Sequence, residues 1–242
     1  MIFRQLFEPL SSTYTYLLGC EETGQAVLLD PVIVSMERDL GEIRRLGLTL
    51  AYSVDTHIHA DHITAALELK NRVGCKIAAP AFDRLACADA GIEEGTPFTV
   101  GSILLQPLHT PGHTPGHFAY LLGDKIFTGD ALLIDGCGRT DFQNGDAAAL
   151  YKSVTEKLFS LPADTLVYPA HDSRIGTFPP LHRKRSAIRG SAKSARWSSS
   201  WKSWRTSICP IRNSLTMPCQ AISNAACVRT MCPRIWRNIA VT

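Results

Sequence analysis

The chain has 242 residues, 45% of them hydrophobic and 19% charged, with a formal net charge of +3. This length suits one large domain, or one domain with an appendage, and the composition is typical of a soluble globular protein. The apolar runs are too short to cross a bilayer, the N-terminus lacks a secretory apolar core, and the eight cysteines show no disulfide-framework spacing, so we expect a cytoplasmic protein with reduced thiols.

Strand and helix patterns alternate through the first two thirds of the chain. Strands are predicted at residues 14–18, 26–29, 48–54, 76–79, 98–109, 118–122, 125–127 and 166–168. Helices are predicted at residues 36–46, 63–73 and 147–159. The last of these helices carries Leu150, Val154 and Leu158 on one face. Strands interspersed with helices indicate a layered α/β domain.

Charge divides the chain into two parts. Residues 1–172 contain 12 Lys and Arg and all 22 Asp and Glu, whereas residues 173–242 contain 13 Lys and Arg and no acidic residue. All four tryptophans also lie in the second part, and seven of the eight histidines lie in the first. We therefore expect a folded domain over residues 1–172 and a basic tail of a different kind over residues 173–242.

The segment that follows the predicted strand 48–54 is rich in metal-ligating side chains. It reads Thr56-His57-Ile58-His59-Ala60-Asp61-His62, with three imidazoles and a carboxylate within six residues. Neutral imidazole and carboxylate are ligands for zinc, iron and similar divalent ions. A polar surface loop is the ordinary alternative, but packing these ionisable groups without a metal would be costly. The motif therefore predicts a metal site.

Further candidate ligands occur later in the domain. His113 lies in a loop stiffened by proline and glycine, where a ligand is held in place. In the same loop, His109 and His117 could be ligands, supporting groups or turn residues. Asp130 ends a predicted strand, as a ligand that completes or bridges a site would, and His171 follows the last strand in the same way.

This spacing of histidines and aspartates resembles the metallo-β-lactamase superfamily. Residues 129–143, which read GDALLIDGCGRTDFQ, are similar to the persulfide dioxygenases rather than to the glyoxalase II hydrolases. The N-terminal stretches RQLFE and SSTYTYLL agree with this. The resemblance covers residues 1–172 and implies an α/β fold: an αβ/βα sandwich of two mixed β-sheets flanked by helices.

The resemblance also implies a reaction and a cofactor. Enzymes of this family oxidise glutathione persulfide with O2 and water to sulfite and glutathione, a step of sulfide oxidation. They use one Fe(2+) per chain, and the ligands carried over to this sequence are His57, His113 and Asp130. Two histidines and one carboxylate leave coordination positions open. The residues expected to stand behind these ligands and orient them are His59, Asp61, His62 and His171.

The alternative is a glyoxalase II-like thioester hydrolase, in which those same four residues would hold a second metal and activate hydroxide. Arg139 matches an arginine of the family's glutathione pocket. A guanidinium suits this place because it can bind a carboxylate of the tripeptide through two hydrogen bonds. A surface salt bridge is the other interpretation of Arg139. Cys137 is interpreted as a packing residue rather than a nucleophile, because the reaction needs no protein thiolate.

The tail is interpreted as an out-of-frame translation that is poorly ordered. Residues 211–218 can be encoded so that a shifted frame gives PKFIDYA, and residues 177–184 so that the same frame gives VSTIAQE. Both resemble family segments that follow the last histidine. A frameshift near Ser173 would remove parts of the glutathione pocket, so we expect the metal site to form and turnover to be impaired.

A third class of function is a non-enzymatic one, either an inactive relative or a nucleic-acid-binding protein that uses the basic tail. The expected partners are nevertheless glutathione persulfide and O2, with no nucleic acid, no membrane and a possible homodimer.

Overall fold

The computed structural model describes residues 1–134 and 136–171, which contain two mixed β-sheets. The first sheet has six strands in the order β1-β2-β3-β4-β5-β6. Its strands are β1 (Ile2–Glu8), β2 (Thr13–Gly19), β3 (Gln25–Leu29), β4 (Thr49–Val54), β5 (Lys76–Pro80) and β6 (Ala90–Ile92). Strands β1 to β3 pair antiparallel, and β3 to β6 pair parallel.

The second sheet has five strands in the order β11-β10-β9-β8-β7. Its strands are β7 (Phe98–Val100), β8 (Ile103–His109), β9 (Phe118–Leu122), β10 (Lys125–Gly129) and β11 (Leu166–Pro169). Strands β10 and β11 pair parallel, whereas β10 with β9, β9 with β8 and β8 with β7 pair antiparallel. Side chains from both sheets, including Tyr16, Leu105 and Phe127, form one apolar cluster between them.

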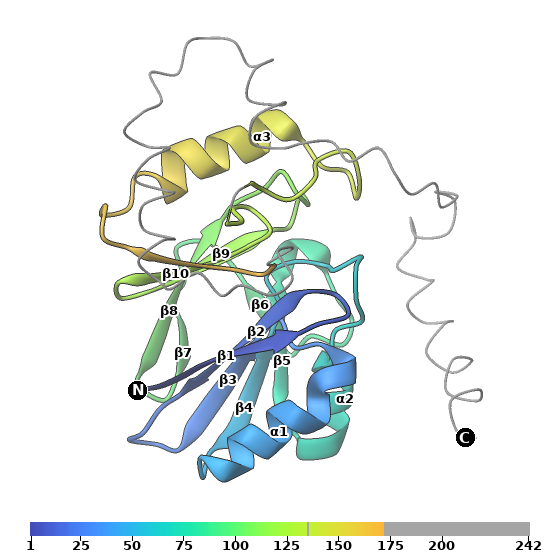
Figure 1. Ribbon diagram of the computed structural model, residues 1–242, viewed down its shortest axis with the longest axis vertical. Helices are drawn as coiled ribbons and strands as arrows, with labels where there is room; N and C mark the ends of the chain where they lie inside the picture. The colour runs from blue at the N-terminus through green and yellow to red at the C-terminus, as the bar shows by residue number, and fades with distance from the viewer. Residues whose placement is uncertain (135, 172–242) are drawn as a thin grey trace, which may run out of the picture. The chain divides into compact units, whose positions relative to one another are not determined.

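Helices cover the outer face of each sheet (Figure 1). Helices α1 (Met36–Arg45) and α2 (Ala66–Val73) bury Leu40, Ile43 and Leu69 with side chains of the first sheet. Helix α3 (Ala147–Lys152) continues into the π-helical segment η3 (Ser153–Leu158) and covers the second sheet. Short 3-10 turns occur at η1 (Ile33–Ser35) and η2 (Ala81–Asp83). The layers form the αβ/βα sandwich that the sequence predicts.

Some predicted boundaries were wrong. The strand predicted at residues 98–109 is a hairpin of two strands, because Gly101 adopts a left-handed φ of +59° between β7 and β8. The helix predicted from residue 63 begins at Ala66, because Thr64 donates its hydroxyl hydrogen bond to Asp55 and Ala65 pairs its N–H with the Pro31 carbonyl. Strands β1 and β6 were not predicted.

The topology places several strand ends at one edge of the sandwich. Since β3 and β4 are parallel neighbours, Asp30 and the segment from Asp55 onward leave the first sheet side by side. Asp130 and His171 leave the second sheet in the same way after β10 and β11. The backbone N–H of Tyr14, at the start of β2, donates to the carbonyl of Ala170, directly after β11, at 2.7 Å. This hydrogen bond joins the two sheets at the edge where these strands end. In the described part of the chain, no helix is long and apolar enough to cross a membrane.

Candidate metal centre

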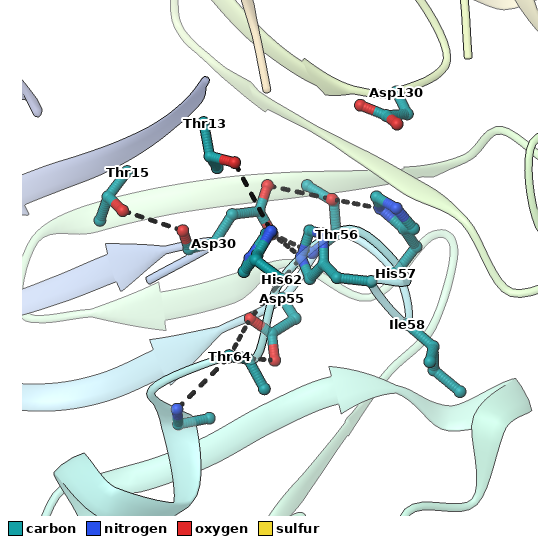
Figure 2. A network of polar contacts seen from close by, with 12 residues as sticks. Thr13, Thr15, Asp30, Asp55, Thr56, His57, Ile58, His62, Thr64 and Asp130 are labelled. Atoms are coloured by element: carbon teal, nitrogen blue, oxygen red, sulfur yellow. Dashed lines mark hydrogen bonds and ion pairs between the residues drawn. The ribbon is translucent and has the colours of Figure 1, made fainter. Parts of the chain in front are cut away.

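The loop after β4 is anchored by a buried aspartate. The backbone N–H of Thr56 donates to Asp30 Oδ1 at 2.7 Å, and the Thr56 hydroxyl donates to Asp30 Oδ2 at 3.0 Å (Figure 2). Asp30 itself has a left-handed φ of +50°, and its carbonyl accepts a hydrogen bond from the Thr15 hydroxyl. These contacts fix the loop where it turns from the strand into the histidine motif.

Three of the sequence-predicted residues converge on one point. His57, His113 and Asp130 each offer a ligand atom, and these atoms all lie within 4.8 Å of one another. All three residues are buried. His113 Nε2 lies 3.4 Å from Asp130 Oδ2, and the rings of His57 and His113 meet edge to face with centroids 4.8 Å apart. Figure 2 shows that Asp130 comes from a segment separate from that of His57.

Hydrogen bonds determine which ring nitrogen of each histidine is available. The Thr56 hydroxyl already donates to Asp30, so at 2.9 Å it accepts from His57 Nδ1. His113 Nδ1 lies 2.8 Å from the Arg139 carbonyl, which can only accept. Both rings therefore carry their proton on Nδ1 and leave Nε2 as a lone-pair donor. This is the usual arrangement of a metal-binding histidine.

The charge state of the cluster fits a metal ion. Burial lowers the pKa of His57 well below its ordinary value, and the charge on His59 adds to this effect. The ring is therefore neutral, as a ligand must be. Asp130 Oδ1 is buried and has no hydrogen-bond partner among the described residues. Two lone-pair nitrogens and a carboxylate oxygen that lacks a donor make a set that a divalent cation would satisfy.

His59 is directed toward carboxylates of the first sheet. Its Nε2 lies 3.1 Å from Asp30 Oδ1 and 4.0 Å from Asp55 Oδ1, and its side chain is 2% exposed. Burial alone would lower the pKa of His59, but these carboxylates raise it to about 9. Burial would likewise raise the pKa of Asp30, but His59 and Thr56 lower it. His59 and Asp30 thus form a buried ion pair.

A second group of predicted residues lies on the other side of Asp130. His62 Nδ1 lies 2.9 Å from Asp61 Oδ2, and His171 Nε2 lies 3.4 Å from the same oxygen. His171 Nε2 also lies 3.3 Å from Asp130 Oδ1. The ligand atoms of His59, Asp61 and His62 are close enough to form a metal-sized group of their own. This is the place where a dinuclear enzyme would hold a second ion.

The remaining predicted residues play different parts. His109 Nε2 contacts the Pro115 carbonyl at 2.9 Å, and His117 is fully buried beside the ring of His57. Arg139 holds Asp141 through two hydrogen bonds of 2.8 and 3.0 Å and lies over the ring of Phe142. Cys137 packs against the apolar cluster under α3.

Sequence reasoning missed two supporting residues, Asp30 and Thr56. Asp30 could have been found by the signal that singled out Asp130, because both are aspartates directly after a strand. The role of Thr56 depends on a hydroxyl that contacts two side chains, and spacing along the chain does not reveal such a contact.

Comparison with known proteins decides the family. Residues 9–171 match the model of the metallo-beta-lactamase superfamily. The human mitochondrial persulfide dioxygenase ETHE1 is 49% identical over 177 residues, which cover 71% of this chain and 68% of the human protein. The chain belongs to the persulfide dioxygenase family of this superfamily. A solved structure of ETHE1 from Myxococcus xanthus has a TM-score of 0.72 and 45% identity, covering 82% of this chain and 93% of that one.

Hydrolases of the superfamily are more distant relatives. A hydroxyacylglutathione hydrolase from Rhodospirillum rubrum is 37% identical over 167 residues, which cover 67% of this chain and 63% of that protein. The persulfide dioxygenase assignment therefore agrees with the resemblance of residues 129–143. The tail from residue 173, and the interpretation that it is out of frame, lie outside the described residues.

Proposed function

We propose that this member of the family oxidises glutathione persulfide with O2 and water, releasing sulfite and glutathione. The proposed cofactor is one iron(II) ion per chain, held by His57, His113 and Asp130. The observation that supports this choice is the convergence of the ligand atoms of His57, His113 and Asp130 within 4.8 Å of one another. The choice of one ion rather than two rests on the similarity to the persulfide dioxygenases, because the contact of His59 Nε2 with Asp30 leaves His59 Nδ1 without a hydrogen-bond partner among the described residues.

The residues around the proposed ligands would hold the site in one arrangement. Bound iron(II) would supply the redox-active centre that chemistry with dioxygen requires. Thr56 and the Arg139 carbonyl keep the two histidines in the tautomer that presents Nε2. His171 Nε2 lies 3.3 Å from Asp130 Oδ1, so the two side chains flank the same space. Contacts of this kind orient the ligands and raise the affinity of the site for its metal.

The Arg139 side chain is proposed to bind a carboxylate of the glutathione moiety. Its guanidinium lies at an exposed position, 61% accessible, and is held by Asp141. The backbone carbonyl of the same residue accepts a hydrogen bond from His113 Nδ1. Arg139 would therefore bind substrate through its side chain and orient the metal ligand His113 through its backbone. A carboxylate bound there would lie next to the segment that positions His113.

A second candidate is a thioester hydrolase with a dinuclear site. The observation in its favour is the group formed by His59, Asp61 and His62, together with His171 near both Asp61 and Asp130. A bridging Asp130 would then serve two ions. The identity of 37% to a hydroxyacylglutathione hydrolase, against 49% to human ETHE1, favours the dioxygenase.

Two assays on the full chain separate these candidates. The purified protein is loaded with iron(II), and oxygen uptake and sulfite release are followed with glutathione persulfide. S-lactoylglutathione hydrolysis is followed in parallel. The dioxygenase proposal predicts oxygen uptake that depends on the persulfide and is lost in His113→Ala. Thioester hydrolysis without oxygen uptake would support the hydrolase instead.

We also propose that residues 173–242 are out of frame and that turnover is impaired as a result. Sequencing the coding DNA around codon 173 tests the first part. A chain that carries the shifted frame after Asp172 tests the second, since it is expected to turn over faster with the same metal content. Equal rates for both chains would refute the second part. The possible homodimer and the absence of nucleic-acid and membrane partners stay predictions.

A further inference from the structure

His117 is a buried histidine that the proposed reaction does not use. Its side chain contacts three segments that carry or flank the proposed ligands. Nδ1 lies 2.8 Å from the Thr110 hydroxyl, and Nε2 accepts the backbone N–H of Asp130 at 3.1 Å. The ring also stacks on His57, with centroids 5.0 Å apart and an angle of 27° between the planes.

The tautomer of His117 follows from these partners. A backbone N–H only donates, so Nε2 must hold a lone pair and the proton must be on Nδ1. Nδ1 then donates to the Thr110 hydroxyl. A neutral ring with one fixed donor and one fixed acceptor results.

The backbone around the ring is built for close approach. Gly129 precedes Asp130 and has a left-handed φ of +51°. A Cβ at this position would lie 2.6 Å from His117 Nε2 and 2.8 Å from the Thr56 hydroxyl. Glycine is therefore needed both for the turn and for the contact between His117 and the strand end. A histidine that only filled space in the core would not need this approach to its Nε2.

We infer that His117 is a positioning residue that sets Asp130 and His57 at the spacing required for one metal ion. Its Nε2 fixes the backbone from which the Asp130 carboxylate extends, and its ring supports the face of His57. Thr110 fixes the ring from the opposite side. This inference rests on the proposed function, because it takes His57 and Asp130 as metal ligands.

Two substitutions separate the two ends of the ring. In His117→Gln, the amide oxygen can reach the position of Nε2 and accept the Asp130 N–H. In His117→Asn, the amide nitrogen replaces Nδ1 beside Thr110, but no acceptor remains for Asp130. If His117 only packs in the core, both variants should affect metal binding to a similar extent. If His117 is a positioning residue, the glutamine variant should bind metal more tightly than the asparagine variant.

The experiment titrates Co(II), as a spectroscopic probe, into the metal-free full chain and its variants. His117→Asn should weaken Co(II) binding roughly 10- to 100-fold, the usual effect of removing a partner behind a ligand. His117→Gln should recover at least about 10-fold of this loss, because an acceptor for a buried N–H is restored. The Co(II) absorption bands should shift in the asparagine variant and stay close to wild type in the glutamine variant. His109→Gln, in the same loop, is the matched control and should bind as wild type does.

A measurement on the unmodified protein keeps the test independent of folding in the variants. Long-range ¹H–¹⁵N spectra of the metal-free chain should show His117 with its proton on Nδ1. A proton on Nε2 would overturn the inference, as would equal Co(II) affinities for the asparagine and glutamine variants. Failure of the wild type to bind one Co(II) per chain, or undiminished binding in Asp130→Asn, would instead refute the proposed ligands.

Discussion

The carboxylate of Asp30 accepts hydrogen bonds from both the backbone and the hydroxyl of Thr56, at 2.7 and 3.0 Å. This double contact anchors the start of the loop with three histidines at the end of β4. It also passes orientation on to His57, because the Thr56 hydroxyl is left to accept from His57 Nδ1.

Removal of the Thr56 hydroxyl should weaken the metal site. Thr56→Val keeps the shape of the side chain but leaves His57 Nδ1 without its acceptor. We expect metal affinity to fall roughly 10- to 100-fold, as is typical when the partner of a ligating histidine is lost. Equilibrium titration of the metal-free chain with iron(II) under anaerobic conditions measures this. Thr56→Ser retains the hydroxyl and should bind close to wild type; equally weak binding by both variants would contradict the role given to the hydroxyl.

Loss of the Asp30 charge should destabilise the metal-free fold. Asp30→Asn breaks a buried ion pair with His59 in which both side chains are 2% exposed. Removing one partner of such a pair costs about 3–5 kcal/mol, because the other charge stays buried. Urea denaturation of the metal-free chain gives the free energy of unfolding. Glu37→Gln breaks the exposed pair with Arg72 and should have a much smaller effect. Equal losses in the two variants would show that the buried pair has no special weight.

The same pair predicts a pH dependence of stability. The pKa of His59 is raised to about 9 in the folded chain from an ordinary value of 6.5. A raised histidine pKa stabilises the fold fully below pH 6.5, and this contribution is lost as the pH rises toward 9. The loss is at most about 1.4 kcal/mol per pH unit for one proton. Melting temperatures of the metal-free chain between pH 6 and 9.5 test this. His59→Gln should show a flatter profile over this range, and an unchanged slope would exclude His59 as the cause.

Arg139 should affect substrate binding without affecting the metal. Arg139→Gln removes the guanidinium but keeps the backbone carbonyl that holds His113. We expect KM for glutathione persulfide to rise about 10-fold or more, the value of a charge-assisted hydrogen bond, with an unchanged iron content. Steady-state oxygen uptake and iron analysis measure the two effects. Arg45→Gln, an exposed residue in the last turn of α1, is the control. A variant that loses iron while KM stays constant would contradict a substrate-binding role and would show that the Arg139 side chain supports the metal site.

Much of the fold was predictable because the apolar residues of the sequence recur at the spacing typical of helices and strands. Helix 147–159 was predicted from Leu150, Val154 and Leu158, and all three are buried. The break at Gly101 was missed because the apolar residues continue on both sides of the turn. Strand β1 was missed because polar and apolar side chains do not alternate regularly along it. Its first six residues are partly buried, and Glu8 is buried.

The residues of the candidate site were predictable from the sequence, but the contacts between them were not. His57, His113 and Asp130 converge because motif spacing and strand ends fix where the chain turns. The direction of His59 was less predictable, since it depends on Asp30 from a neighbouring strand. The contact of His117 with Asp130 depends in the same way on residues 13 positions apart that meet through a glycine.

The proposed function depends on one metal ion held by His57, His113 and Asp130. Crystals of the iron-loaded full chain, measured with X-rays at the iron absorption edge, test this most directly through anomalous scattering. We predict one peak per chain, in contact with His57, His113 and Asp130, with His59 still paired with Asp30. A second peak of similar height among His59, Asp61, His62 and His171 would contradict the single-iron account and support the dinuclear hydrolase.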